Sequence, residues 1–209
     1  MTTAQLELQD VKISIDGLPL VEIDCTISGG EILTVMGPSG SGKSSLLAYI
    51  AGFLPPVFES TGKVCIDGND LSDVPAQKRS IGLLFQDPML FPHLSVAGNL
   101  RFGISSREKN KNKIIETGLK DFQLAGFEDR DPQTLSGGQK SRVALLRLLL
   151  SKPIAVLLDE PFAKLDTALR REQRKTVFDN LRNAKLPTVL VTHDHEDAEA
   201  AGGTVIELV

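Results

Sequence analysis

Gly37-Pro-Ser-Gly-Ser-Gly-Lys-Ser44 is the stretch of sequence that decides the fold. The apolar run Ile32 to Met36 before it is typical of a strand buried on both faces, and Ser44 to Ala51 after it predicts a helix closed by Gly52. The stretch matches G-x-x-x-x-G-K-[ST], a pattern that has a physical meaning only between a strand and a helix. That condition is met, so we predict a phosphate-binding loop rather than a glycine-rich turn.

In such a loop, glycines allow successive backbone N–H groups to converge on phosphate oxygens, and the helix that follows adds the positive end of its dipole. Lys43 is expected to reach the β- and γ-phosphates of ATP, and the Ser44 hydroxyl to ligate Mg²⁺. The residues assigned to the nucleotide here are Gly37, Pro38, Ser39, Gly40, Ser41, Gly42, Lys43, Ser44 and Ser45.

A second buried-strand pattern, Ile154 to Leu158, ends in Asp159-Glu160. Ligands of doubly wound proteins bind at the carboxyl ends of such strands. Asp159 is expected to hold Mg²⁺ and Glu160 to polarise the attacking water. Acidic residues also follow strands simply because they stabilise helix N-termini, but the phosphate loop favours the functional interpretation.

Leu135-Ser-Gly-Gly-Gln139 precedes a strongly helical segment, Lys140 to Leu150. Ser136 is expected to cap that helix, and the two glycines leave backbone N–H groups uncovered, which makes a second anion site. Because the chain already has a phosphate loop, this site calls for a phosphate carried by another copy. We therefore predict a dimer.

The rest of the chain predicts an α/β fold. Alternating apolar residues from Leu6 to Ile27, with a turn at Asp16-Gly17, indicate an antiparallel β-layer. Strands alternating with helices indicate a mostly parallel sheet. The predicted further strands are 63–66, 81–85, 154–158, 188–191 and 205–208, and a polar helix is predicted over 166–184. Residues 87–152 have a helical character and are expected to form a subdomain inserted into one P-loop domain, 1–209.

The composition is that of an ordinary globular chain of 209 residues. Its net charge of −4 gives no electrostatic reason to bind nucleic acid. No apolar run is long enough to span a bilayer, and the start lacks the pattern of a secretory signal, so a cytoplasmic location is expected. Cys25 and Cys65 lack metal-ligand spacing and are expected to be reduced core residues, and His195 is treated as a surface residue.

Taken in order along the chain, these motifs resemble the ATP-binding cassette ATPases over nearly the whole sequence. The motifs are Gly37 to Ser44, Gln86 in Phe85-Gln-Asp, Leu135 to Gln139, Asp159-Glu160, Leu165-Asp166 and His193. The resemblance implies a head-to-tail dimer in which ATP lies between one copy's loop and Ser136, Gly137, Gly138 and Gln139 of the other. It also implies that Gln86 contacts Mg²⁺ and water, His193 the γ-phosphate, and Asp166 the partner copy.

The segment from Asp87 to Leu100 is similar to bacterial importers of iron, sulfate, polyamines and thiamine, and the chain also resembles the short YnjD-like ATPases. This implies two transmembrane permease subunits, a substrate-binding protein, and a place on the cytoplasmic face of the bacterial inner membrane, with membrane contact through the permease alone. Phe91, Pro92 and Leu94 become candidates for docking the permease, and core packing is their alternative role.

Other function classes remain as alternatives. They are an exporter or a lipid- or protein-release ATPase subunit, a soluble cassette ATPase acting on ribosomes or DNA, and a nucleotide-binding scaffold that does not hydrolyse. The lack of a second cassette or a long insertion argues against the soluble class, and the presence of Glu160 argues against the scaffold.

One departure concerns the base. The family usually stacks adenine on an aromatic residue near the position of Ile13 or Ile15, but no Phe, Tyr or Trp occurs before Tyr49. Because a base–aromatic stack contributes roughly 1–3 kcal/mol, its loss is expected to weaken nucleotide binding about 5- to 150-fold unless aliphatic contacts substitute. GTP is accordingly expected to compete with ATP.

Overall fold

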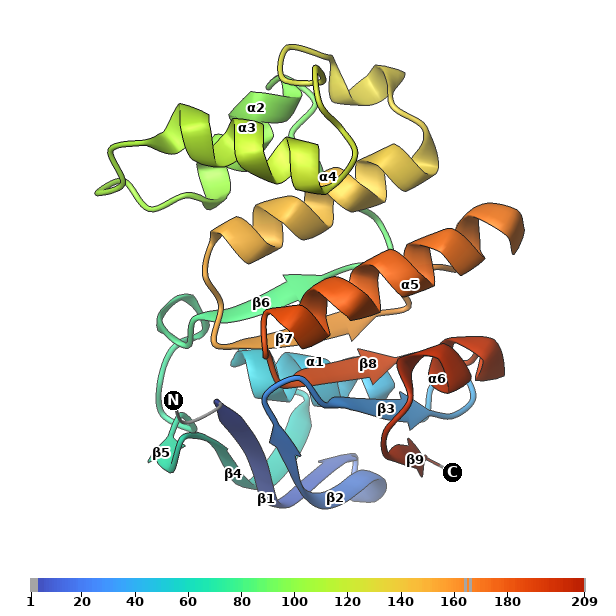
Figure 1. Cartoon of the computed structure of the whole chain (residues 1–209). Coiled ribbons are helices and arrows are strands. Elements are labelled where there is room, and N and C mark those ends of the chain that lie inside the picture. The colour runs from blue at the N-terminus through green and yellow to red at the C-terminus, as the bar shows by residue number, and fades with distance from the viewer. Residues whose placement is uncertain (1–3, 164, 166, 209) are drawn as a thin grey trace.

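The computed structural model describes residues 4–163, 165 and 167–208, and it is built in layers (Figure 1). An antiparallel sheet lies at one end, a parallel sheet lies in the middle, and helices cover the far face of the parallel sheet. The predicted α/β fold, with a P-loop core and an N-terminal antiparallel β-layer, is confirmed.

The parallel sheet has the strand order β6-β7-β8-β3-β9. Its strands are β6 (Ile81–Leu84), β7 (Ala155–Asp159), β8 (Thr188–Val191), β3 (Ile32–Met36) and β9 (Val205–Glu207). Val191 is the register partner of both Val35 and Asp159, so β3, β8 and β7 end together at one edge. That edge carries the start of the phosphate loop, Asp159-Glu160 and His193.

The antiparallel sheet has the order β2-β1-β4-β5 and contains β1 (Gln5–Ile15), β2 (Leu18–Ser28), β4 (Phe58–Ile66) and β5 (Asn69–Asp70). Asp16 and Gly17 form the predicted turn between β1 and β2, with φ values of 51° and 76°. β4 starts at Phe58 rather than at Lys63 as predicted, because its pairing with β1 continues to the pair Ile15–Phe58. Residues 59–62 contain no apolar side chain, so a search for apolar alternation does not detect this part of the strand.

Six α-helices are seen among the described residues: α1 (Lys43–Ala51), α2 (Val96–Gly103), α3 (Lys111–Asp121), α4 (Gly137–Leu150), α5 (Thr167–Asn183) and α6 (His195–Ala201). Short 3₁₀ turns cover Ala76–Lys78 and Pro132–Thr134. α2, α3 and α4 all come from the segment 87–152, and α4 also packs against β6. The short helix α6 was not predicted from the sequence.

Alternate residues of the parallel strands belong to two different hydrophobic clusters, one on each face of the sheet. Leu33, Leu157 and Val189 point to the side of α1 and the antiparallel sheet. Val156, Leu158 and Leu190 point to the side of α4 and α5. Both faces of the sheet are therefore buried, as expected for a parallel sheet, and the ends of its strands are held in fixed positions.

Candidate nucleotide-binding and hydrolytic site

A cavity of about 470 Å³ opens over the phosphate loop. The start of the loop's helix forms one part of its wall, Glu160 another, and the apolar side chains of Ile15, Leu20 and Phe58 a third. The loop residues that line it are Ser39, Gly40, Gly42, Lys43, Ser44 and Ser45. A cavity with a polar loop at one end and an apolar wall at the other suits a phosphate chain attached to a base.

The loop needs its glycines. Gly42 has a φ of 91° and a Cβ there would lie 2.8 Å from Cγ2 of Val21, while a Cβ at Gly37 would lie 2.7 Å from the carbonyl oxygen of Leu208. Lys43 is only 7% exposed. Its ammonium donates to the carbonyls of Gly37 and Pro38, at 2.8 and 2.6 Å, so a positive charge is held inside the loop.

The two carboxylates at the end of β7 differ in environment. Burial, and then the charge of Glu160, raise the pKa of Asp159, while Lys43 acts in the opposite direction. Glu160 has a left-handed backbone with φ 44°, which is uncommon outside glycine and is found often at functional sites. A half-buried carboxylate beside a second one favours a cation, and the Ser44 hydroxyl on the cavity wall adds an oxygen donor of the kind Mg²⁺ prefers. These residues therefore fit Mg²⁺.

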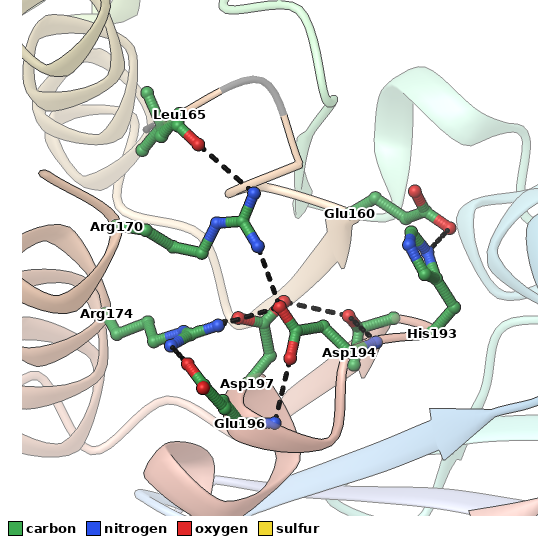
Figure 2. A network of polar contacts seen from close by, with 9 residues as sticks. Glu160, Leu165, Arg170, Arg174, His193, Asp194, Glu196 and Asp197 are labelled. Atoms are coloured by element: carbon green, nitrogen blue, oxygen red, sulfur yellow. Dashed lines mark hydrogen bonds and ion pairs between the residues drawn. The ribbon is translucent and has the colours of Figure 1, made fainter. Parts of the chain in front are cut away.

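His193 lies against Glu160, with Nδ1 2.9 Å from Oε1 (Figure 2). The histidine side chain is 64% exposed and that of Glu160 is 25% exposed. Gln86 is exposed and follows β6 by two residues. Because Leu84 is the register partner of Leu158, the parallel register carries Gln86 to the same edge as Glu160, although Gln86 does not line the cavity.

The segment predicted to hold the second anion site forms the start of α4, away from the cavity over the phosphate loop. Ser136 caps α4: its Oγ accepts from the N–H of Gln139 at 3.3 Å, and its own N–H donates to Oε1 of Gln139 at 2.9 Å. The predicted N-cap is confirmed, and the helix starts at Gly137, earlier than expected. None of residues 136–139 lines the cavity over the phosphate loop. A single chain therefore does not bring the Ser136 cap to the cavity over the phosphate loop.

Other predicted site residues have varied surroundings. Ser41 is buried, and its hydroxyl has no hydrogen-bond partner among the described residues. Gly37 and Pro38 line a smaller neighbouring cavity together with His193 and His195. Asp166 lies outside the described residues.

A family model described as ABC transporter matches residues 20–163, which is more than half of the chain. The chain belongs to the ABC transporter family. The family expected from the ordered motifs is thus confirmed, and with it ATP binding, and ATP hydrolysis coupled to transport, as the family's activity.

Three relatives agree with this, and two of them are named as import proteins. The chain is 43% identical to the uncharacterised ABC transporter ATP-binding protein YnjD of Escherichia coli, over 87% of this chain and 84% of YnjD. It is 40% identical to the spermidine/putrescine import ATP-binding protein PotA of Mesoplasma florum, over 96% of this chain and 58% of PotA. For the Fe(3+) ions import ATP-binding protein FbpC of Yersinia pestis the identity is 41%, over 92% of this chain and 56% of FbpC. The chain thus spans little more than half the length of these two import proteins.

A solved structure with the same fold is cbiO1 of Clostridium perfringens, described as part of the ABC transporter complex cbiONQ. Its TM-score is 0.83 at 27% identity, and the match covers 97% of this chain and 84% of cbiO1. The layered arrangement of the cassette core is therefore shared with a known transporter subunit.

Phe58 lines the cavity over the phosphate loop, and it was not identified as a site residue from the sequence. It is the aromatic residue among those that line the cavity, and it faces the phosphate loop from β4, as the strand partner of Ile15. The sequence does not show which residue replaces the aromatic one that the family usually has near the position of Ile13 or Ile15. If the pairing of β4 with β1 is continued from Lys63 back toward the N-terminus, Phe58 falls opposite Ile15. That continuation is the sequence signal that could have identified Phe58.

The remaining predictions concern side chains outside this site. Cys25 and Cys65 are free, in β2 and β4, as expected. Burial, and then the charge of Asp24, raise the pKa of Cys25 to about 11. His195 is exposed, and the described part of the chain contains no cluster of three or more His, Cys, Asp or Glu that could hold a metal. Among the described residues, no helix combines the length and apolarity that crossing a membrane requires.

We expect Asp159→Asn to raise the melting temperature of the nucleotide-free protein. The folded pKa of Asp159 is raised, so its charged form is disfavoured on folding, and the cost is present at pH 7 and disappears as the pH falls through that pKa. A stabilisation of about 1 kcal/mol corresponds to roughly 2–4 °C for a chain of this size. Calorimetry at pH 7 and pH 4 measures it, and a lower melting temperature at pH 7 contradicts the inferred cost.

Proposed function

We propose that this chain is the ATP-hydrolysing subunit of a bacterial importer and works as a head-to-tail dimer on permease subunits. The observation that carries the proposal is that the Ser136 cap of one chain lies outside the cavity that its own phosphate loop lines. The phosphate loop and the Ser136 cap are both formed, but only the loop faces the cavity. Two copies facing each other complete two sites at once.

The loop end of the cavity binds the phosphates. Its backbone N–H groups and the N-terminus of α1 point toward anionic oxygens, and Lys43 exchanges the carbonyls of Gly37 and Pro38 for the β- and γ-phosphates. Ser44, Gln86 and Asp159 would hold Mg²⁺, and the ion would supply positive charge against the phosphates. Such a cation would stabilise the charged form of the half-buried Asp159 carboxylate, whose pKa is raised.

Hydrolysis needs an oriented water and a group that accepts its proton. Glu160 is the general base, because its carboxylate lines the cavity above the loop and remains a quarter exposed. His193 contacts Glu160, and we propose that it binds the γ-phosphate. In a dimer, Ser136, Gly137 and Gly138 of the partner copy offer hydroxyl and N–H donors to the same phosphate, and Asp166 contacts the partner.

This arrangement explains how ATP moves the subunits. The γ-phosphate is held by both copies, so ATP stabilises the closed dimer more than ADP does, and that difference in affinity is what a switch requires. The imports named for PotA and FbpC favour an importer over an exporter, a release ATPase or a soluble cassette ATPase. Docking to two permease subunits, which work with a substrate-binding protein, places the chain at the cytoplasmic face of the inner membrane. We propose no contact with nucleic acid.

The permease is proposed to dock in a cavity of about 250 Å³ between β6 and the helices α2 and α4. Three exposed apolar side chains line it: Phe85 is 44% exposed, Met89 60% and Phe102 71%. A group of exposed apolar side chains around a hollow is typical of an interaction site. The resemblance suggested three other docking residues, Phe91, Pro92 and Leu94. They do not line this cavity.

The floor of this docking surface is rigid. Arg147 donates to the carbonyls of Met89 and Pro88 at 2.9 and 3.1 Å. Asn99, which is fully buried, accepts from the N–H of Phe91 at 2.8 Å and donates to its carbonyl at 3.1 Å. A permease helix that binds this surface therefore contacts the segment after β6, which these hydrogen bonds hold in place. That segment connects the docking surface to Gln86.

The proposed dimer is tested by measuring ATP hydrolysis per molecule over a wide range of protein concentrations, with Mg²⁺ present. A site completed by a second copy gives a specific activity that rises with concentration until the dimer is saturated. Ser136→Arg is expected to abolish the hydrolysis and to leave ATP binding unchanged. A specific activity that is independent of concentration at every dilution, and is unaffected by Ser136→Arg, rejects the shared site.

Phe58→Ala is expected to weaken ATP binding about 5- to 150-fold, because a base stacked on an aromatic ring gains roughly 1–3 kcal/mol. Stacking tolerates any base, so GTP is still expected to compete with ATP. The measurement is a nucleotide titration of both variants and the wild type, with Phe53→Ala as a control, because Phe53 is 49% exposed and does not line the cavity. Equal affinities for Phe58→Ala and Phe53→Ala, or a strong wild-type preference for ATP, go against this assignment.

A further inference from the structure

Arg170 lies near the start of α5 and is bonded to two separate segments of the site (Figure 2). Its Nη2 donates to the carbonyl of Leu165 at 3.1 Å, and its Nη1 donates to Oδ2 of Asp194 at 2.9 Å. Leu165 belongs to the segment that leads from Glu160 into α5, and Asp194 directly follows His193. One guanidinium thus joins the segments that carry Glu160 and His193.

Asp194 is a fixed anchor for this contact. It accepts from the N–H of Glu196 at 2.9 Å as the N-cap of α6, and from Nη2 of Arg174 at 2.9 Å. Burial acts to raise the pKa of Asp194, but the Glu196 N–H and the charges of Arg174 and Arg170 outweigh it and lower the pKa. The carboxylate is therefore ionised at neutral pH, and Arg170 bonds to a charged partner.

Arg174 holds the anchor in place from the same helix. Its side chain is 6% exposed and also bonds to Asp197, which is 4% exposed, and to Glu196 (Figure 2). Asp197 in turn accepts from the hydroxyl of Thr192 at 2.8 Å, one residue before His193. α5 therefore forms the rigid side of the network, and the segment 192–197 is attached to it at several points.

The contact between Glu160 and His193 is too exposed to fix its own geometry. With the histidine side chain 64% exposed, solvent and salt screen the pair, and such surface pairs contribute little. Glu160 also has a left-handed backbone, which persists only where the surroundings hold it. The relative position of the two side chains must therefore be set by the segments on which they lie.

We propose that Arg170 is a positioning residue that sets the distance between Glu160 and His193 by bonding both of their segments to α5. It lies outside the nucleotide cavity and contacts no reacting atom. The planar fork of the guanidinium reaches two acceptors in different directions, which a lysine ammonium on a flexible stem does not reproduce. The inference rests on the proposed role of Glu160 as the general base.

The test compares Arg170→Met, Arg170→Lys and Arg182→Met in the full-length chain. Arg182 is a matched control, because it lies on the same helix and joins it to α6 through the carbonyls of Ala200 and Ala201. For each variant we measure kcat and KM for Mg²⁺–ATP hydrolysis, and the melting temperature. Glu160→Gln is measured in the same assay.

Arg170→Met is expected to lower kcat on the order of 10²-fold with KM unchanged, since small displacements of catalytic groups have effects of this size. Arg170→Lys is expected to restore only part of kcat, and Arg182→Met to keep the wild-type kcat even if its melting temperature falls. Equal kcat values for Arg170→Met and Arg182→Met, or a rise in KM that accounts for the loss, overturn the inference. If Glu160→Gln remains active, the proposed function itself fails, whatever Arg170→Met does.

Discussion

Glu160→Gln is expected to lower kcat for ATP hydrolysis by about 10²–10⁴-fold, the usual contribution of a positioned general base. The amide keeps the shape of the side chain and an oxygen toward His193, but it does not accept a proton. The residues that bind the phosphates are untouched, so the affinity for ATP is expected to stay within a few-fold of the wild type. Steady-state hydrolysis and an independent binding titration measure the two quantities.

Glu199→Gln is the control for this substitution, because Glu199 is an exposed carboxylate of α6 that does not line the cavity. It is expected to hydrolyse ATP like the wild type. Residual activity of Glu160→Gln above a tenth of the wild-type kcat contradicts the assignment of Glu160 as the base, because general-base contributions are larger, of order 10² or more.

Arg174→Met is expected to lower the free energy of unfolding by about 3–5 kcal/mol, because it removes the cation from a buried cluster of charges. Asp197 is 4% exposed and bonds to Nε of Arg174 at 2.5 Å, so the substitution leaves a buried carboxylate without its counter-ion. Methionine fills much of the space, so the loss reflects charge rather than a cavity. Urea unfolding at pH 7 measures it.

Lys12→Met is the matched control for a charge that is removed from the surface. Lys12 pairs with Glu22 at 2.6 Å, but the two side chains are 58% and 74% exposed. Exposed pairs are screened by solvent and contribute little to stability, so this variant is expected to unfold almost like the wild type. If Arg174→Met costs no more than Lys12→Met, the cluster around Asp194 and Asp197 does not hold α5 and α6 together.

Much of the core could be predicted because its patterns are local. Ile32 to Met36, the glycine loop and the helix after it occur in one continuous stretch, and the apolar run that ends at Asp159 is of the same kind. The turn at Asp16-Gly17 was also readable, since both residues accept positive φ angles. These elements were found where the sequence places them.

The missed features depend on contacts between distant residues. Phe58 reaches the cavity only because β4 pairs with β1 as far as Ile15, through a stretch of polar residues with no apolar alternation. The helix α6 has seven residues and is held by Asp194 and by side chains of α5, so its own sequence gives a weak signal. Arg170 looked like one charge on a polar helix, and its two partners are apparent only in the folded chain.

Two copies of this chain are proposed to enclose ATP between the loop of one and the Ser136 cap of the other. The most direct test is the mass of Glu160→Gln in solution, measured by light scattering without nucleotide and with saturating Mg²⁺–ATP, because this variant is expected to bind ATP without hydrolysing it. We expect that ATP doubles the mass and that adding Ser136→Arg restores the monomer. A dimer that forms equally well with Ser136→Arg, or a monomer at saturating ATP over the whole concentration range, contradicts it.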